Sequence, residues 1–283
     1  MMKIKTYLQS LYKSSTATSY HLEWLDFESF VNQLNISIKS IDYQLLLDYV
    51  QALQKRNLKP VSINRKLLII EQVFKYLLPN QANPVKGFRV KRQGRKPILE
   101  PLEISDLEVV LTNFSKESIY QKRNHLILGF IHYQALRVGE IKALELEHLD
   151  LEKALINVPK VGRNKSRTLA LTALQVVGLQ EYLISIRPQL LQYYTNQLFV
   201  SGGQSKRLNN SITKLQKGIK KQLPKLQNLE HWRTSIIVHW LESSPLLEVQ
   251  ERLGHCYPSS TERYKIHAIK SLRDQLEVHH PLQ

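Results

Sequence analysis

The chain has 283 residues, 42% of them hydrophobic, so it is long enough for two domains or one large domain with a packed core. Its 40 Lys and Arg residues against 24 Asp and Glu give a net charge of +16, which favours a polyanion such as nucleic acid as partner. A single cysteine excludes an internal disulfide and a cysteine-based zinc site, and no apolar run is long enough to span a membrane, so we expect a cytoplasmic protein.

The N-terminal third has the apolar periodicity of helices and lacks the alternation of strands. In the segment SINRKLLIIEQVFKYLL, residues 62–78, the apolar residues that share one helical face are Ile63, Leu67, Ile70, Val73, Phe74 and Leu77. Asn64, Arg65 and Lys66 fall on other faces, and we predict that they contact DNA. Residues 1–92 are therefore expected to form a small helical bundle with a basic outer face.

A stretch rich in proline, glycine and basic residues follows this helical part, and it has little periodicity. Such a composition is typical of a linker, which we place at residues 93–104. The second domain, residues 105–283, is mostly helical, with one predicted hairpin of strands Leu155–Pro159 and Arg167–Leu171. Arg163 and Arg167 make this hairpin basic, and we predict that both contact DNA.

Two basic residues are candidates for a phosphate site in the first half of the second domain. Arg137 follows an apolar helix in ALRVGEIKAL, so its stem is expected to be buried and its guanidinium to bind an anion; a structural pair with Glu140 is the alternative. Lys160 lies at the end of the first hairpin strand, where a lysine is either surface charge or a mobile proton donor.

Two further motifs lie near the C-terminus. Arg233 stands at the start of an apolar helix in LEHWRTSIIVHWLESSP. In LGHCYPSSTERY, His255 precedes Tyr264 by nine residues. The order along the chain is thus Arg, Lys on a hairpin, Arg, His and Tyr.

With these motifs the sequence resembles the tyrosine recombinase (phage integrase) family over nearly the whole chain. The matching stretches are SINRKLLIIEQVFKYLLPNQANPVKG, ALRVGEIKAL, VQERLGH and SSTERY. The resemblance implies a mainly α fold with a small β-hairpin or sheet. It places an N-terminal helical core-binding (SAM-like) domain before a C-terminal mixed α/β catalytic domain that ends in a tail helix.

The resemblance also implies site-specific recombination of double-stranded DNA through a 3′-phosphotyrosine intermediate. The implied catalytic residues are Arg137, Lys160, Arg233, His255 and Tyr264. The two arginines would bind the non-bridging oxygens of the phosphate, the histidine would hydrogen-bond to it, and the tyrosine would attack it. Lys165 is an alternative to Lys160 as the proton donor. Neither a metal nor a small-molecule cofactor is expected, because the covalent bond conserves the energy of the phosphodiester.

One position departs from the family pattern. The family has a histidine three residues before its second arginine, and Glu230 occupies that position. A carboxylate there would repel the phosphate unless it is turned away, protonated or acting as the base. His231 is adjacent but points about 100° away on a helix. The general base is left open between Glu230 and His231.

The family further implies a homotetramer on paired DNA sites that exchanges strands through a Holliday junction. The apolar residues of the tail recur at helical spacing, which suggests docking on a neighbouring protomer: Ile266, Ile269, Leu272 and Leu276. The main alternative is a catalytically impaired regulator that keeps the fold and binds DNA. A topoisomerase-like enzyme that nicks and reseals a single duplex is a third reading.

Overall fold

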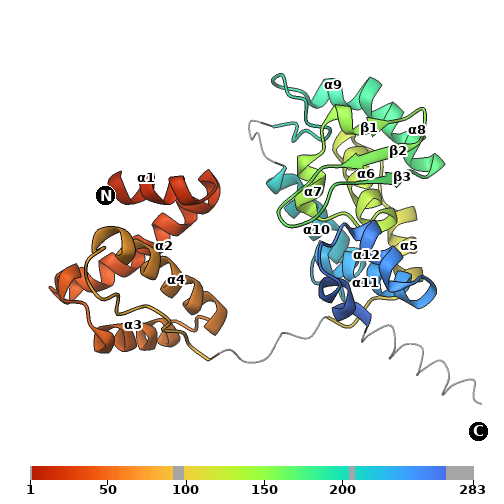
Figure 1. Ribbon diagram of the computed structural model, residues 1–283. Helices are drawn as coiled ribbons and strands as arrows, with labels where there is room; N and C mark the ends of the chain where they lie inside the picture. The colour runs from red at the N-terminus through yellow and green to blue at the C-terminus, as the bar shows by residue number, and fades with distance from the viewer. Residues whose placement is uncertain (1, 92–98, 204–207, 266–283) are drawn as a thin grey trace, which may run out of the picture. The chain divides into compact units, whose positions relative to one another are not determined.

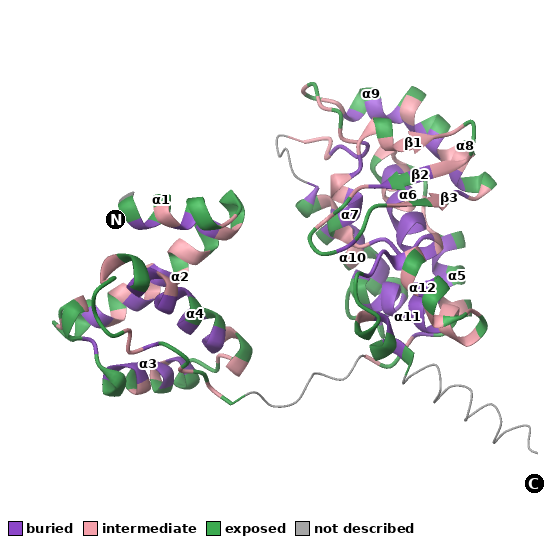
Figure 2. Ribbon diagram, viewed as in Figure 1, coloured by how far each residue is buried: buried purple, intermediate pink, exposed green. Residues whose placement is uncertain are grey.

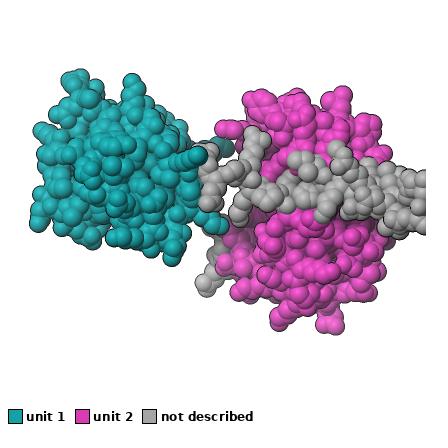
Figure 3. All heavy atoms as spheres, turned by 90° about the horizontal axis from the view of Figure 1, so that it is seen from below, with its two compact units in different colours: residues 1–96 teal, residues 97–283 magenta. Residues whose placement is uncertain are grey.

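The computed structural model describes residues 2–91, 99–203 and 208–265, and the chain forms two compact units, residues 1–96 and residues 97–283 (Figure 3). The expected fold class, mainly α with a small sheet, is confirmed (Figure 1). The predicted tail helix lies outside the described residues, as does the first half of the predicted linker, residues 93–98. None of the helices within those ranges combines the length and apolarity needed to cross a bilayer.

Unit 1, residues 1–96, is a helical bundle. Its helices are α1 (Met2–Leu11), α2 (Ser14–Gln33), α3 (Tyr43–Lys55) and α4 (Pro60–Leu77). The Asp42 carboxylate accepts a 2.9 Å hydrogen bond from the backbone N–H of Leu45 and caps α3, and Pro60 opens α4 with its fixed φ. Trp24 and Phe27 of α2 are fully buried, and aromatic contacts join them to Phe74 and Tyr49. The core of this unit is therefore aromatic as well as aliphatic.

Unit 2, residues 97–283, contains most of the regular elements. Its helices are α5 (Ile104–Thr112), α6 (Ile119–Tyr133), α7 (Val138–Ala143), α8 (Ala173–Glu181), α9 (Arg187–Leu190), α10 (Asn209–Gln222), α11 (Leu229–Ser243) and α12 (Leu246–Leu253). A π-helical stretch, Tyr182–Ile186, joins α8 to α9. A last described helical stretch covers residues 259–265.

Helices α6 and α11 lie at the centre of unit 2 and pack against each other (Figure 2). Residues 126–132 of α6 and 231–238 of α11 are buried almost without interruption. Two buried helices of this kind need partners on every side, which the surrounding helices provide. The C-terminal end of α6 and the N-terminal end of α11 are thereby held in fixed positions, and both carry candidate site residues.

A three-stranded antiparallel sheet lies beside these helices. Its strands are β1 (Leu149–Asp150), β2 (Leu155–Val158) and β3 (Arg167–Ala170), in the order β1-β2-β3. The sequence predicts β2 and β3 to within one residue, with Leu155 opposite Ala170 and Val158 opposite Arg167. It does not predict β1, whose two residues are too few to show a pattern.

The last residues of the predicted linker pack on unit 2. The backbone N–H of Leu102 donates a 2.9 Å hydrogen bond to the hydroxyl of Ser235 in α11, and the Leu102 side chain is buried. The chain is thus anchored to α11 before α5 begins.

Candidate active site

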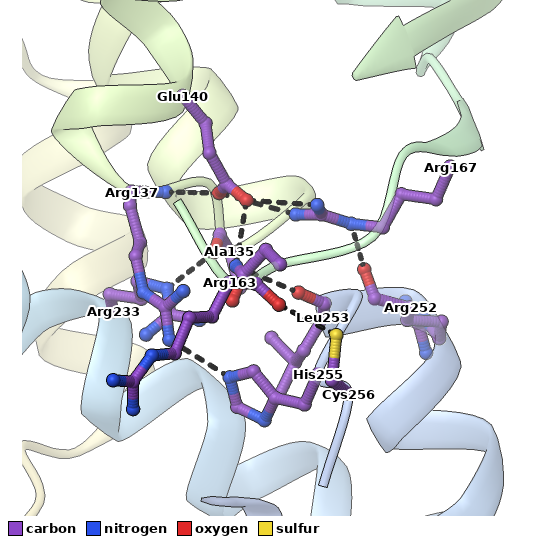
Figure 4. Close-up of polar contacts among 11 residues, drawn as sticks. Ala135, Arg137, Glu140, Arg163, Arg167, Arg233, Arg252, Leu253, His255 and Cys256 are labelled. Atoms are coloured by element: carbon purple, nitrogen blue, oxygen red, sulfur yellow. Dashed lines mark hydrogen bonds and ion pairs between the residues drawn. The ribbon is translucent and has the colours of Figure 1, made fainter. Parts of the chain in front are cut away.

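Arg137 lies at the junction between α6 and α7. Ala135 takes a left-handed backbone conformation with φ of +47°, which turns the chain after α6 and places Arg137 at the N-cap of α7. The backbone N–H of Arg137 donates to Oε2 of Glu140 at 2.9 Å, so the side chain leaves the start of a short, well-anchored helix (Figure 4).

Glu140 is a buried carboxylate that binds several neighbouring groups of the site. Its side chain is 1% exposed, and it accepts hydrogen bonds from both terminal nitrogens of Arg167, at 2.9 and 3.2 Å, and from the amide of Asn164 at 2.9 Å. Burial opposes ionisation, but the bonds and charge of Arg167 outweigh it and lower the pKa of Glu140. The sequence suggested a pair between Glu140 and the guanidinium of Arg137; the guanidinium that Glu140 binds is that of Arg167.

Arg233, in the second turn of α11, is fully buried. Its Nε donates to the carbonyl oxygen of Ala135 at 2.6 Å, and its Nη1 donates to Oε1 of Glu230 at 2.9 Å. Its Nη2 is buried and has no hydrogen-bond partner in the described part of the chain. A buried, unsatisfied guanidinium donor is a costly arrangement, and an anion is the kind of partner that would satisfy it.

His255 follows the turn that ends α12. Its Nε2 lies 3.0 Å from Nη2 of Arg137 (Figure 4). Its Nδ1 lies 2.8 Å from the hydroxyl of Thr261. Burial lowers the pKa of His255 to about 4, with the positive charges of Arg233 and Arg137 acting in the same direction. The structure thus brings Arg137, Arg233 and His255 together, as the sequence predicts.

The turn before His255 is locked to the hairpin loop. Gly254 has φ of +66°, and a Cβ there would lie 2.8 Å from the carbonyl oxygen of Lys165, so the position requires glycine. The backbone N–H of Lys165 donates to the carbonyl oxygen of Gly254 at 2.8 Å. The side chains of Lys160 and Lys165 are both exposed, and neither forms an ion pair with a described residue. Both candidates for the proton donor therefore remain available on the same loop.

Tyr264 lies in the helical stretch of residues 259–265 and is 6% exposed. Burial lowers the pKa of Arg137 and Arg233 acts in the same direction, whereas Glu140, Glu230 and Tyr264 raise it. Tyr264 therefore lies near Arg137, and its role as the nucleophile stays a prediction.

The two candidates for the general base occupy different environments. His231 is buried, its Nε2 lies 2.7 Å from the carbonyl oxygen of Glu100, and its Nδ1 accepts from the backbone N–H of Gln227 at 3.3 Å. Both ring nitrogens are therefore engaged outside the arginine cluster. The side chain of Glu230 is 55% exposed and bonds directly to Arg233.

Two of the residues predicted to bind DNA in unit 1 are engaged inside that unit, which corrects the prediction. Asn64 is 4% exposed, and its amide exchanges two hydrogen bonds, of 2.9 and 2.7 Å, with the backbone of Val90. Lys66 is 6% exposed and forms ion pairs with Glu23 and Asp26. Their side chains hold α4 to its neighbours and are not free for a phosphate.

Of the two basic residues predicted to contact DNA from the hairpin, one is buried in other contacts and one is exposed. Arg167 donates from Nε to the carbonyl oxygen of Arg252 at 2.7 Å and from its other two nitrogens to Glu140, so it is structural and not a DNA contact. Arg163 is exposed on the loop. Arg65 of unit 1 is also exposed, although it pairs with Glu23. For Arg163 and Arg65, DNA contact stays a prediction.

A basic face on α10 was not predicted. Lys214, Lys217 and Lys221 are exposed at i, i+3 and i+7, opposite the buried Ile212, Leu215 and Ile219, and none of the three lysines forms an ion pair with a described residue. The signal is in the sequence, because residues 182–229 contain basic residues but no Asp or Glu. A helix face of this kind is suited to bind phosphates.

Comparison with known proteins places these features in a wider group. The sequence profile of the phage integrase family matches residues 102–270. Tyrosine recombinase XerD of Staphylococcus saprophyticus is 26% identical over 276 residues, covering 95% of this chain and 93% of that protein. Tyrosine recombinase XerC of Syntrophus aciditrophicus is 25% identical over 259 residues, covering 86% and 81%.

Two solved structures share the fold. The XerH site-specific recombinase bound to its difH substrate, in a pre-cleavage complex, gives a TM-score of 0.72 at 19% identity over 95% of this chain and 84% of that chain. A lambda integrase tetramer bound to a Holliday junction gives a TM-score of 0.68 at 11% identity, with 93% and 75% covered.

Proposed function

Because the chain belongs to the phage integrase family, we propose that it is a site-specific recombinase that cuts and rejoins double-stranded DNA through a covalent bond to Tyr264. The observation that carries this proposal is the buried Nη2 of Arg233, which has no partner among the described residues and lies in a cluster with Arg137 and His255. An unsatisfied guanidinium donor beside a second arginine and a histidine suits a phosphate.

In the proposed reaction the phenolic oxygen of Tyr264 attacks the phosphorus of the scissile phosphodiester. A bond between that oxygen and phosphorus forms, the bond from phosphorus to the 5′-oxygen breaks, and a 3′-phosphotyrosine and a free 5′-hydroxyl result. Arg137 and Arg233 hold the non-bridging oxygens, on which negative charge builds up in the transition state. Attack by a 5′-hydroxyl of the partner strand reverses these steps and reseals the DNA.

Two protons have to move in this reaction. The leaving 5′-oxygen takes up one, which an exposed lysine of the hairpin loop, Lys160 or its alternative Lys165, supplies in this proposal. The phenol of Tyr264 loses the other. Glu230 is a better candidate for the acceptor than His231, because its carboxylate lies at Arg233 whereas both nitrogens of the His231 ring have other partners.

The exposed lysines of α10 support DNA binding by unit 2, and exposed Arg65 supports it for unit 1. We further propose that four protomers act on two DNA sites through a Holliday junction in the cytoplasm. A lambda integrase tetramer with a Holliday junction shares this fold.

The second candidate function is a regulator that binds DNA without cutting it. Glu230 favours it, because a carboxylate bonded to Arg233 lies where the family has a histidine. A DNA duplex nicked next to the cleavage point separates the two, since loss of the short released strand traps any covalent product. We expect a protein–DNA adduct with the wild type and with Tyr257→Phe, a matched change at an exposed tyrosine, but none with Tyr264→Phe. Binding without an adduct on the cognate site would support the regulator.

A further inference from the structure

The imidazole of His255 is held at both of its nitrogens. Nε2 lies 3.0 Å from Nη2 of Arg137, and Nδ1 lies 2.8 Å from Oγ1 of Thr261. A guanidinium has only donors, so Nε2 accepts, and the ring is neutral with its proton on Nδ1. The lowered pKa of His255, about 4, agrees with a neutral ring.

This state of the ring is the wrong one for a phosphate. Phosphate oxygens accept hydrogen bonds, so His255 binds one only when Nε2 carries a proton. Nε2 therefore has to change from acceptor to donor when DNA arrives. The ring either takes up one proton from solvent and becomes an imidazolium, or it exchanges the Nδ1–H tautomer for the Nε2–H tautomer with no change in charge.

Each change determines whether the partner of Nδ1 has to accept or donate a hydrogen bond. An imidazolium keeps Nδ1–H and needs an acceptor there, whereas the Nε2–H tautomer has a lone pair on Nδ1 and needs a donor. A hydroxyl group serves in both cases, because it donates and accepts. Thr261 is 0% exposed and His255 is 3% exposed, so bulk water does not reach the bond to replace it.

Thr261 also connects His255 to the nucleophile. It precedes Tyr264 by three residues in the helical stretch 259–265, so the two side chains leave the same side of the helix. The other charged groups that act on the ring are Arg137, Arg167, Arg233 and Glu140, and among the described residues only Arg137 and Thr261 hydrogen-bond to it. We propose that Thr261 is a positioning residue that keeps His255 directed at the scissile phosphate while Nε2 changes from acceptor to donor. This role rests on the function proposed above.

Two substitutions separate the hydroxyl from the shape of the side chain. Thr261→Val keeps the shape and removes the hydroxyl, and Thr261→Ser keeps the hydroxyl. On the nicked duplex we expect Thr261→Val to form the adduct about tenfold more slowly, since a lost orienting hydrogen bond of about 1.4 kcal/mol is tenfold in rate. Thr261→Ser should stay within about threefold of the wild type. Ser259→Ala, which removes an exposed hydroxyl from the same helix, should not differ from it.

Nitrogen NMR of the His255 ring gives a readout that packing alone does not move. We expect a proton on Nδ1 in the free protein and on Nε2 when Tyr264→Phe is bound to uncut DNA. In free Thr261→Val the proton should stay on Nδ1, because Arg137 still donates to Nε2, but the nitrogen shift of Nδ1 should change because Nδ1–H has lost its acceptor. Comparison of the net proton uptake in buffers of different ionisation enthalpy then identifies the imidazolium or the tautomer.

Three results would overturn the proposal. These are a wild-type rate for Thr261→Val, an equal slowing by Thr261→Val and Thr261→Ser, or a ring whose Nε2 stays unprotonated on DNA. If Thr261→Val melts below the assay temperature, the spectra of the wild type and of DNA-bound Tyr264→Phe decide alone. If neither the wild type nor any variant forms an adduct, the proposed recombinase function is wrong. The spectrum of the free protein then still tests the hydrogen bond between His255 and Thr261.

Discussion

Glu230→Gln is expected to strengthen binding of the uncleaved scissile phosphate. Nη1 of Arg233 donates to the Glu230 carboxylate at 2.9 Å, and the guanidinium is buried whereas the glutamate side chain is 55% exposed. An incoming phosphate competes with this carboxylate for Arg233 and is repelled by its charge. Glutamine keeps the length and the accepting oxygen and removes the charge.

The size of the effect depends on the exposure of Glu230 and on its separation from the phosphate, taken as about 6 Å. Two unit charges about 6 Å apart interact by about 0.7 kcal/mol in water and about 3 kcal/mol at an effective dielectric constant of 20. The exposure of Glu230 moves the value towards the water limit, to roughly 1–1.5 kcal/mol. Removal of the charge should therefore lower Kd by about tenfold. A separation of about 6 Å is shorter than the Debye length of ~8 Å, so part of the gain persists at physiological salt.

The assay compares Tyr264→Phe with Tyr264→Phe/Glu230→Gln, because neither forms the covalent bond. Each binds the cognate duplex and the same duplex with an uncharged methylphosphonate at the scissile position. The gain should appear on the charged DNA and largely vanish on the neutral one. Glu248→Gln, which removes an exposed charge from α12, is the control for net charge. An equal gain on both DNAs, or none, would refute the view that Glu230 opposes the phosphate.

Three other predictions concern Glu140, His255 and the proton donor. Glu140→Gln should lower the free energy of unfolding, measured by urea denaturation, by about 3 kcal/mol, because it leaves the buried guanidinium of Arg167 without its counter-charge. The control Glu181→Gln, at an exposed ion pair, should change that free energy by less than about 1 kcal/mol. His255 binds a proton below about pH 6.5 in the unfolded chain but only below about 4 in the folded protein. The unfolded state therefore holds more protons between these pH values, so the free energy of unfolding should fall as pH drops from 6.5 towards 4. His255→Asn should lose less of this free energy over the same range. An equal loss in the wild type and in His255→Asn would contradict the buried neutral ring. Lys160→Ala should slow cleavage by about 100-fold, and the rate should recover on DNA whose leaving group is a 5′-sulfur, which needs no proton. Lys165→Ala should leave the rate of cleavage unchanged. The reverse result would assign the proton transfer to Lys165.

The arrangement of the site was predictable because its residues belong to short motifs with fixed spacing. The step of nine positions from His255 to Tyr264 and the step of three from Glu230 to Arg233 determine which side chains share a turn or a helix face. The structure brings Arg137 to the same place from another helix. Local sequence was enough for these positions because each motif has its own secondary structure.

The predicted DNA contacts were less reliable, because a basic residue shows its charge in the sequence but not its partner. Lys66 is neutralised by Asp26, forty residues earlier, and Arg167 by Glu140, twenty-seven residues earlier. Glu140 lies in helix α7 and Arg167 in strand β3, so only the fold brings such pairs together. Thr261 was missed for a similar reason, since its hydroxyl becomes significant only when the ring of His255 is placed against it.

The most direct test of the account is to identify the residue that carries the DNA. Adduct formed on the nicked duplex is digested with nuclease and protease, and the peptides are analysed by tandem mass spectrometry. The account predicts a nucleotide attached through its 3′-phosphate to Tyr264 and no adduct in Tyr264→Phe. A nucleotide on Tyr257 or on any other residue, or a cognate site that is bound tightly and never becomes attached, would contradict it.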